Sequence, residues 1–541
     1  MNNSIFKFPR PANEPVLQYL KDSAERKALD AALDKISNEE IEIPLIIGGK
    51  EVKTANIATV VMPHNHKKVL AKYHQAGEKE VNMAIEAALE AKKAWENMPW
   101  TERASIVLKI AELLSKKYRA IINASTMLGQ SKNIYQAEID SACETIDFLR
   151  FNAHYASQIY CDQPGSIANQ LNRVEYRPLE GFVFALSPFN FTSIASNLSM
   201  SPILMGNTVL WKPSSTSILS NYYLMKIYKE AGLPDGVINF IPGKGSVLGK
   251  VITSNKMLAG IHFTGSTDTF NTLWKNIADN MQNYISYPKL VGETGGKDFV
   301  FVHNSANALD VATALVAGAF EFQGQKCSAA SRAYVPKSMW NDVKKHILEH
   351  IAKIKIGCVM DTNNFMNAVI DEASFDNIMN YINGAKTSKE CEIVCGGNGD
   401  KSKGYFIEPT VITTTNPKYK SMVEEIFGPV LTIYIYEDDK FDETLDLCNT
   451  STAYGLTGAI FSNNRYTTEY MMEKLRYAAG NFYINDKPTG AMVGLQPFGG
   501  ARASGTNDKA GSYLNLIRWT NPRAIKETFI PANDIIYPYM K

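Results

Sequence analysis

One cysteine in this sequence has neighbours that would let a large ligand reach its sulfur atom. Cys327 lies in GQKCSAASR, where glycine, serine and alanine surround it and Lys326 and Arg332 flank it. A thiolate is a strong nucleophile, whereas a cysteine buried among apolar side chains is inert. This stretch alone therefore leaves two interpretations open, a structural thiol and a catalytic nucleophile.

Two polar residues at predicted strand ends could assist such a nucleophile. Asn190, in SPFNF, offers an amide that can donate a hydrogen bond to a developing oxyanion. Glu293, in GETGGKD, stands between glycines, and a carboxylate in such a turn can activate water as a general base. Ser-Pro and Asn are also common in turns, and a loop glutamate is usually solvated, so each signal is weak alone.

Two other stretches have features of a phosphate site. KPSS places Lys212 at a predicted strand end, where it could bind ribose hydroxyls or a phosphate; a surface lysine is the alternative. In FTGSTDT, Gly265 permits close backbone approach, and Ser266 or Thr267 can cap a helix whose amides face a pyrophosphate; a glycine-rich turn is the alternative. The upstream PGKGSVLG does not fit G-x-G-x-x-G, because its last glycine comes one residue late.

Alternating strands and helices are predicted to hold these residues in place. Buried strands are predicted at 181–186, 207–212, 237–241, 260–263, 298–302, 332–336, 430–436 and 458–462. Such alternation is typical of parallel sheets, which bind ligands at the carboxyl ends of their strands. Helices are expected at 17–36 and 137–154, among others. Residues 168–180 have the alternation of a hairpin strand, which could pair with 515–530 or with a partner chain.

Bulk composition excludes several classes of protein. The 541 residues are 45% hydrophobic with a net charge of +1, so no global field would attract nucleic acid or an acidic membrane. The seven scattered cysteines favour a reducing compartment, and the dispersed histidines give no indication of a metal site. The N-terminus shows no signal-peptide or transit-peptide pattern, and no apolar run predicts a membrane span, so we expect a cytoplasmic location.

The order of these residues carries more information than each residue alone. Asn190, Lys212, Gly265, Glu293 and Cys327, followed by EEIFGPV at 424–430, form a series that resembles the aldehyde dehydrogenase superfamily. The segments NFYINDKPTG and GLQPFGGARASGTNDKAG are similar to the branch that oxidises L-glutamate γ-semialdehyde. The resemblance runs from about residue 40 to the end. It implies an α/β fold with a Rossmann-like NAD-binding domain, an α/β catalytic domain and a β-hairpin oligomerisation flap.

The resemblance also implies domain boundaries. These are an N-terminal extension (1–60), an NAD-binding domain (61–167 and 181–290), an oligomerisation flap (168–180 and 512–541), a catalytic domain (291–480) and a substrate-anchoring loop region (481–511).

By the same resemblance, Cys327 is the nucleophile, Asn190 and the Cys327 backbone N–H hold the oxyanion, and Glu293 activates water. The residues implied for NAD are Ser187, Lys212, Gly265, Ser266, Thr267, Asp268, Thr269, Glu425 and Phe427. The residues implied for the substrate are Ser328, Gly490, Ala491, Phe191, Phe498 and Glu144. The segment GETGG replaces the commoner E-L-G-G, and Asp298 stands where asparagine is frequent. Ser215 stands where strictly NAD-dependent members often have an acidic residue, which weakens discrimination against NADP.

The expected activity is therefore NAD-dependent oxidation of glutamate semialdehyde through a cysteine hemithioacetal and a thioester, the second step of proline breakdown. Expected partners are the semialdehyde, at least one further copy of the chain, and transiently a proline dehydrogenase. A dehydrogenase for another short semialdehyde is the nearest alternative. A cysteine hydrolase is a more distant one, because only His262 lies within the motif stretches as a partner for Cys327.

Overall fold

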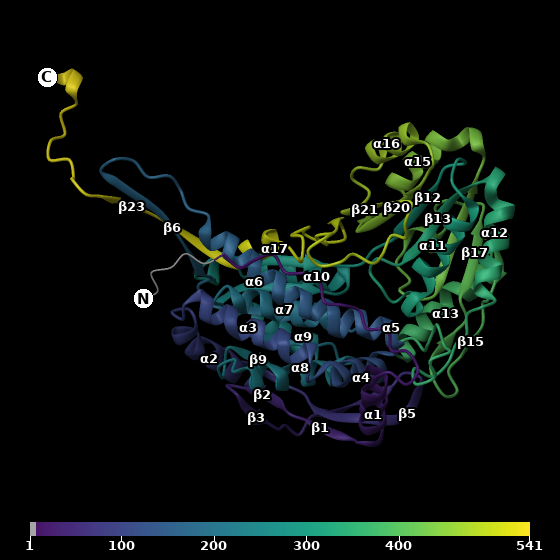
Figure 1. Ribbon diagram of the computed structural model, residues 1–541, viewed down its shortest axis with the longest axis horizontal. Helices are drawn as coiled ribbons and strands as arrows, with labels where there is room; N and C mark the ends of the chain where they lie inside the picture. The colour runs from purple at the N-terminus through teal and green to yellow at the C-terminus, as the bar shows by residue number, and fades with distance from the viewer. Residues whose placement is uncertain (1–6) are drawn as a thin grey trace.

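Two seven-stranded sheets dominate the computed structural model, which describes residues 7–541 (Figure 1). The first sheet has the order β11-β10-β7-β8-β9-β2-β3. Its strands are β2 (Leu45–Ile47), β3 (Lys50–Val52), β7 (Phe182–Leu186), β8 (Val209–Lys212), β9 (Ile238–Phe240), β10 (Leu258–Thr264) and β11 (Lys289–Glu293). The strands β7 to β11 are parallel, whereas β2 and β3 are antiparallel to their neighbours.

Helices cover both faces of the first sheet, and the alternation in β7 shows why. Val183 and Ala185 belong to one apolar core, while Phe182, Phe184 and Leu186 belong to the core on the opposite face. The helices of this part are α1 (Ala24–Asn38), α2 (Glu78–Trp95), α3 (Trp100–Ser115), α4 (Arg119–Gln130), α5 (Ile134–Ala137), α6 (Thr145–Cys161), α7 (Thr192–Leu204), α8 (Ile218–Ala231), α9 (Gly245–Thr253) and α10 (Thr267–Asp279). A strand buried on both faces reads as a continuous apolar run, which is the pattern that predicted it.

The second sheet has the order β14-β17-β18-β13-β12-β20-β21. Its strands are β12 (Asp298–Val302), β13 (Ala330–Pro336), β14 (Cys391–Cys395), β17 (Thr410–Thr414), β18 (Val430–Tyr436), β20 (Thr457–Phe461) and β21 (Asn481–Ile484). Its helices are α11 (Ala308–Phe320), α12 (Lys337–Ile351), α13 (Glu372–Thr387), α14 (Lys420–Val423), α15 (Phe441–Thr450) and α16 (Arg465–Lys474). Cores on its two faces contain side chains from α11 and α12 and from α15 and α16, respectively.

Both sheets reverse their strand order beside a central strand. In the first sheet the chain runs from β7 outward through β8 and β9, then returns to β10 and β11 on the other side of β7. In the second sheet β13 lies on one side of β12 and β20 on the other. Ligands of such sheets bind at the carboxyl ends of the strands where the order reverses. The segments after β7 and β10 therefore mark a crevice of the first sheet.

Smaller sheets complete the chain. A three-stranded sheet contains β1 (Ile41–Ile43), β4 (Ile57–Met62) and β5 (Asn65–His74). Two-stranded pairs are formed by β15 (Gly399–Asp400) with β16 (Phe406–Ile407), β19 (Tyr454–Gly455) with β22 (Ala501–Arg502), and β6 (Gln170–Pro178) with β23 (Thr520–Thr528). The strand β23 follows the short helix α17 (Tyr513–Ile517). The pair β6–β23 projects from the body of the molecule (Figure 1).

The structure corrects several predicted boundaries. The first helix begins at Ala24 and not at Leu17, because Ser23 caps it and Tyr19 and Asp22 have positive φ angles. Residues 45–52, expected in an N-terminal extension, form β2 and β3, and Ile46 pairs with Phe240 of β9 in the first sheet. Part of that predicted extension, residues 1–6, lies outside the described residues. In contrast, the predicted pairing of 168–180 with 515–530 is confirmed, since β6 pairs with β23 in antiparallel register.

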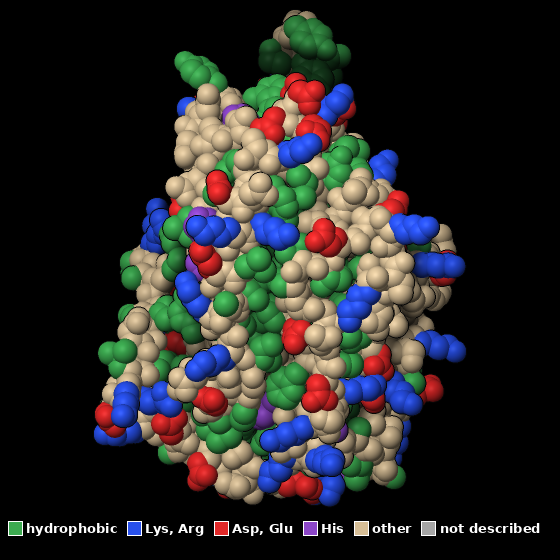
Figure 2. All heavy atoms as spheres, turned by 90° about the vertical axis from the view of Figure 1, so that its right-hand side faces the viewer, with side chains coloured by type: hydrophobic (Ala, Val, Ile, Leu, Met, Phe, Trp, Pro, Cys, Tyr) green, Lys and Arg blue, Asp and Glu red, His purple; other side chains and the backbone are tan. Residues whose placement is uncertain are grey.

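Two features of the whole molecule bear on membranes and on charged partners: the composition of its helices and the distribution of charge on its surface. Among the described helices, none combines the length and apolar composition that a bilayer crossing needs. On the face shown in Figure 2, basic and acidic side chains are intermixed, with no extended patch of one sign. Such a surface fits the net charge of +1.

Candidate active site

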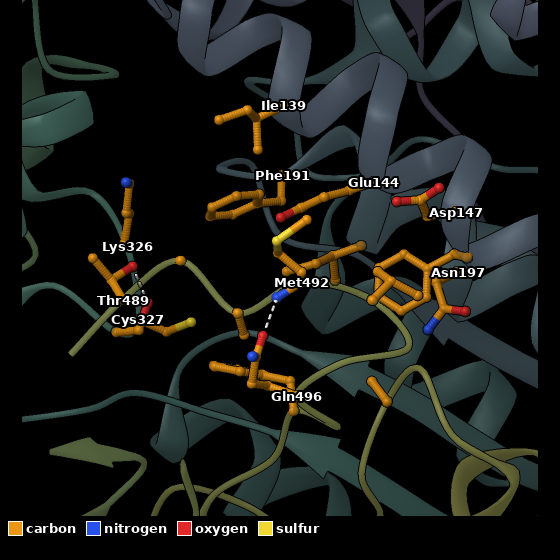
Figure 3. A pocket seen from close by; sticks show the side chains of 18 of the residues that line it. Ile139, Glu144, Asp147, Phe191, Asn197, Lys326, Cys327, Thr489, Met492 and Gln496 are labelled. Carbon is orange, nitrogen blue, oxygen red and sulfur yellow. Dashed lines mark hydrogen bonds between the residues drawn. The ribbon is translucent and has the colours of Figure 1, made fainter. Parts of the chain in front are cut away.

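Cys327 lies in a tightly fixed loop between α11 and β13. We call residues 321–329 the nucleophile loop, after the role expected of Cys327. Phe322, Gln323 and Gly324 all have positive φ angles, and a Cβ atom on Gly324 would lie 2.3 Å from the Gly428 carbonyl oxygen. The Gln323 amide donates hydrogen bonds to the carbonyls of Ser131 (2.9 Å) and Ala368 (3.0 Å). The strained turn is therefore held from several sides, and it directs the Cys327 sulfur into a cavity (Figure 3).

Asn190 contacts the same loop from the first sheet. It follows β7, is buried, and its Nδ2 donates to the Gln325 carbonyl at 3.1 Å. That carbonyl is two residues before Cys327. Asn190 is not among the residues that line the cavity, whereas Cys327 is. The amide thus reaches the nucleophile loop across the junction of the two sheets.

Glu293 ends β11, and its carboxyl group lines the same cavity as Cys327. Its Oε2 accepts a hydrogen bond from the Gly500 N–H at 3.0 Å, and a Cβ atom on Gly499 would lie 3.0 Å from its Oε1. Burial raises the pKa of Glu293 well above its ordinary value, which the Gly500 hydrogen bond and the positive charge of Lys509 oppose. The side chain therefore holds a proton more tightly than an exposed glutamate does, as a group that must accept a proton from water requires.

The cavity has a volume of about 390 Å³ and is lined by residues of both sheets and of their connections. All six residues expected at the substrate line it: Glu144, Phe191, Ser328, Gly490, Ala491 and Phe498. Phe191, Glu144 and Met492 face the space into which the Cys327 sulfur points (Figure 3). Most of the lining is apolar, and a few polar groups converge on it, as is usual for a small-molecule site.

The loop after β21 supplies one wall of this cavity. Gly490 has a φ of +102°, a conformation that favours glycine. The Ser328 and Thr489 hydroxyls are 2.8 Å apart, which links this loop to the nucleophile loop (Figure 3). The backbone of Gly490 and Ala491 therefore lies close to the residue that follows Cys327.

Glu144 lies on the opposite wall, at the end of a π-helical segment, Glu138–Glu144, that precedes α6. Burial raises its pKa to about 8, and the Ser193 hydroxyl donates to its Oε2 at 3.0 Å. The π-helical turn places it toward the cavity and beside Phe191 (Figure 3). Single π-helical turns inside α-helices are often found at functional sites.

The residues expected at the cofactor gather where the first sheet reverses its strand order. Ser187 follows β7, Lys212 ends the neighbouring strand β8, and Ser266 caps α10 by accepting from the Thr269 N–H at 3.3 Å. Burial lowers the pKa of Lys212, and within residues 7–541 its ammonium has no hydrogen-bond or ion-pair partner. An unpaired ammonium and a helix N-terminus at the same edge of the sheet are both suited to a phosphate-bearing ligand.

Glu425 and Phe427 approach the catalytic groups from the second sheet. Glu425 Oε1 accepts from the Gly296 N–H at 2.8 Å, and burial raises the pKa of this carboxyl to about 7. A Cβ atom on Gly295 would lie 2.3 Å from Glu425 Oε2, so a side chain there would displace the Glu425 carboxylate from its present position. Phe427 has a φ of +58°, and its ring contacts Phe189 edge to face, with centroids 5.7 Å apart.

Sequence reasoning missed the charged side chains that support the cavity. Lys326 and Lys487 both line it and share Glu321, at 3.0 Å and 2.7 Å. Lys132 is fully buried and pairs with Asp140 at 2.7 Å. A lysine in a sequence is usually exposed, so no local signal distinguishes these buried pairs from surface charges.

The fold and the site together define a class of protein. The model of the aldehyde dehydrogenase family matches residues 51–525, and the chain belongs to that family. Delta-1-pyrroline-5-carboxylate dehydrogenase, mitochondrial, of Dictyostelium discoideum is 52% identical over 98% of this chain and 96% of its own length. The human protein of the same name is 49% identical, over 98% of this chain and 94% of its own length.

Solved structures extend the likeness to three dimensions. The Delta-pyrroline-5-carboxylate dehydrogenase of Mycobacterium tuberculosis, solved bound with NAD, superposes with a TM-score of 0.96. The two chains are 48% identical, and the match covers 100% of each. The expected α/β aldehyde dehydrogenase fold is confirmed.

Proposed function

We propose that this aldehyde dehydrogenase uses NAD to oxidise L-glutamate γ-semialdehyde, the hydrolysed form of 1-pyrroline-5-carboxylate, to L-glutamate. The observation that carries the proposal is one cavity that contains the Cys327 thiol, the Glu293 carboxyl and the backbone of Gly490 and Ala491. A nucleophile, a water-activating base and an anchor for a carboxylate are the groups that this oxidation needs. Relatives named for this activity, about half identical over nearly the whole chain, support the substrate.

The first step belongs to Cys327. Its thiolate attacks the aldehyde carbon, and the carbonyl oxygen becomes the oxyanion of a hemithioacetal. Asn190 Nδ2 and the Cys327 N–H donate to that oxyanion. In the resting structure the Asn190 amide bonds the Gln325 carbonyl, so it is already held beside the nucleophile loop.

Glu293 acts on the second half of the reaction. Bound NAD would supply the acceptor for the hydride of the hemithioacetal carbon, and loss of that hydride leaves a thioester on Cys327. The Glu293 carboxylate takes a proton from water, which attacks the thioester carbon and releases the carboxylic acid and the thiol. The Gly500 N–H at 3.0 Å holds the carboxylate in place for this step.

Residues on the two walls of the cavity bind the substrate. The N–H groups of Gly490 and Ala491 and the Ser328 hydroxyl bind the α-carboxylate. Phe191 and Phe498 enclose the aliphatic chain, and Glu144 faces the α-amino group. Ala491 has no side-chain donor, so the backbone supplies that hydrogen bond.

The residues expected at the cofactor have the charge and the backbone geometry that binding of NAD requires. Lys212 supplies an unpaired, half-buried ammonium for the ribose and phosphate, and the segment Gly265–Thr269 presents the N-terminus of α10 to the pyrophosphate. Glu425 would hold the nicotinamide ribose, and Phe427 would pack near the nicotinamide ring. Ser215 provides no negative charge against a 2′-phosphate, so we expect measurable activity with NADP.

The assembly and the compartment are further parts of the proposal. The β6–β23 pair buries little of its own surface, and a two-stranded sheet is marginal alone, which supports pairing with a second copy of the chain. All seven cysteines are free thiols, which supports a reducing compartment such as the cytoplasm. Two of the relatives named above are mitochondrial by name.

NADH production tests the proposed activity directly. Purified protein is assayed with glutamate semialdehyde, succinate semialdehyde and pentanal, each with NAD and with NADP. We expect the highest kcat/KM for glutamate semialdehyde with NAD. A preference for either of the other aldehydes would contradict the proposed substrate, and no NADH with any of them would contradict the proposed class of reaction.

A further inference from the structure

The first part of the described chain reaches the same cavity as Cys327. Residues 7–20, which we call the N-terminal strap, precede the region that the family model matches and contain no helix or strand. Yet Glu14 and Val16 line the cavity together with Cys327. In Figure 1 the strap runs as an extended purple thread across the body of the molecule. A segment outside the family's common region thus forms part of the candidate site.

On one wall, the strap holds the anchoring loop, residues 490–496. Asn13 Nδ2 donates to the Val493 carbonyl at 2.8 Å, and Arg10 Nη2 donates to the Gly494 carbonyl at 2.7 Å. The same Asn13 amide donates to Asp147 Oδ2 of α6 at 2.7 Å. Asn13 therefore joins the anchoring loop to the helix that follows Glu144.

On the other wall, the strap holds the π-helical segment that carries Glu144. The Leu17 N–H donates to Glu138 Oε1 at 2.9 Å, and the Tyr19 hydroxyl donates to Glu138 Oε2 at 2.8 Å. Glu14, itself buried, forms ion pairs with Arg119 and Arg150, each at 2.5 Å. Before Arg10, the Phe8 N–H donates to Ser157 Oγ at 3.3 Å, so the strap is bound to the body on both sides of the two residues that reach the loop.

The anchoring loop needs such support because it has no helix or strand of its own. It is held by the Met492 N–H to Gln496 Oε1 bond of 2.8 Å and by apolar contact of Val493 with Phe148 and Phe151. Gly494 has a φ of +80°, and a Cβ atom there would lie 2.2 Å from the Phe151 ring. The carbonyls that Asn13 and Arg10 bind are therefore in the part of the loop that lies closest to α6.

We propose that Arg10 and Asn13 are positioning residues for substrate specificity. They fix the anchoring loop so that the Gly490 and Ala491 N–H groups are aimed at a carboxylate, an inference that rests on the proposed function. Hydrogen bonds weaken steeply with misalignment, so a loop that is free to move binds a carboxylate less well. Neither residue touches the reacting atoms, so the effect falls on binding of the charged substrate and not on the chemical step.

The test compares two strap variants with two matched controls. Asn13→Ala and Arg10→Ala remove the bonds to the loop, while Asn38→Ala and Arg26→Ala remove the same side chains from α1, where they bond only within that helix. We expect the KM for glutamate semialdehyde to rise about 3- to 10-fold in each strap variant, the loss expected for one net hydrogen bond. The kcat, the KM for NAD and the kcat/KM for pentanal stay at wild-type values, because pentanal has no carboxylate.

Several results would overturn the inference. An unchanged KM for glutamate semialdehyde in both strap variants would show that the anchoring loop keeps its conformation without the bonds to Arg10 and Asn13. A parallel loss with both aldehydes would show a general structural role. The Arg10 side chain is exposed, so Arg10→Ala folds, and melting curves of all four variants establish this. If the wild-type protein fails to oxidise glutamate semialdehyde, the proposed function fails instead, which the wild-type assay alone reveals.

Discussion

At the scale of single residues, burial shifts the pKa of Cys327, of Glu293 and of two ionisable neighbours toward the neutral form. It raises the pKa of the Cys327 thiol and of Glu293, raises that of Glu425 to about 7, and lowers that of Lys297 to about 7. The Lys297 ammonium has no hydrogen-bond partner within residues 7–541. The resting site thus favours neutral forms, and Cys327 becomes a nucleophile only when a base removes its proton.

Cys327→Ala tests the nucleophile. We expect NADH formation from glutamate semialdehyde to fall at least about 10³-fold, because no other described thiol lines the site except the buried Cys143. NAD binding, measured by titration calorimetry, stays within about twofold of wild type. Appreciable turnover in this variant would contradict covalent catalysis by Cys327, and loss of NAD binding would show that the substitution had disturbed the fold.

Glu293→Gln tests the base through its pH dependence. A raised carboxyl pKa means that Glu293 becomes a base only as pH rises through that pKa, so wild-type thioester hydrolysis is slow below it and fast above it. Rapid mixing with NAD should therefore show a burst of NADH in the wild type that shrinks as pH rises.

In Glu293→Gln the burst should persist at all pH values, followed by turnover about 10²- to 10⁴-fold slower than wild type, the usual contribution of a general base. A variant with no burst and slow first turnover would instead assign Glu293 to the activation of Cys327.

At the scale of elements, the sequence predicted those strands whose burial on both faces gives a run of apolar residues. The predicted strands at 181–186, 298–302 and 430–436 correspond to β7, β12 and β18, because both faces of each are covered and the runs are continuously apolar. The candidate residues at their ends followed from the same patterns and from the resemblance.

Non-local features left no such signal. The π-helical turn at 138–144 depends on contacts with distant segments, such as the Leu17 N–H bond to Glu138. The strap is extended where a helix was predicted from Leu17, because its polar groups bond Glu138 and Asp147 and not one another. Propensity within a short window cannot anticipate partners that are more than 100 residues away.

The buried Lys132–Asp140 pair shows how elements are joined at the site. The Lys132 ammonium lies 4.0 Å from the Phe191 ring centroid and 4.4 Å from that of Phe322, while Asp140 accepts the Thr192 and Ser193 N–H groups at the start of α7. One ion pair therefore fixes a substrate-pocket ring, the nucleophile loop and the π-helical segment.

Lys132→Met tests this pair. It leaves Asp140 buried without its cation, so we expect the free energy of unfolding to fall by about 3–5 kcal/mol in urea denaturation. The control Lys93→Met breaks an exposed pair with Glu90 and should cost less than about 1 kcal/mol. In the double variant Lys132→Met/Asp140→Asn, the free energy of unfolding should fall by less than the sum of the losses in the two single variants. Strict additivity would mean that the two charges are not coupled.

At the scale of the whole molecule, the β6–β23 arm has no core of its own. No residue of β6 is buried, and β23 is exposed over most of its length. Beyond β23, Phe529, Ile530, Ile535 and Tyr539 expose most of their apolar surface. The arm projects away from both sheets (Figure 1), so only another molecule can cover it.

Two truncations separate the roles of the arm and of the tail beyond it. A chain that ends at Asn521 loses β23 but keeps the buried Trp519, and we expect light scattering to show a monomer where the full chain is at least a dimer. A chain that ends at Phe529 keeps the β6–β23 pair and should remain oligomeric. A monomeric full-length protein would contradict the proposed assembly. If the chain that ends at Phe529 is also a monomer, the interface lies in the exposed apolar tail, residues 530–541, and not in the arm, because that chain keeps the β6–β23 pair and lacks only the tail.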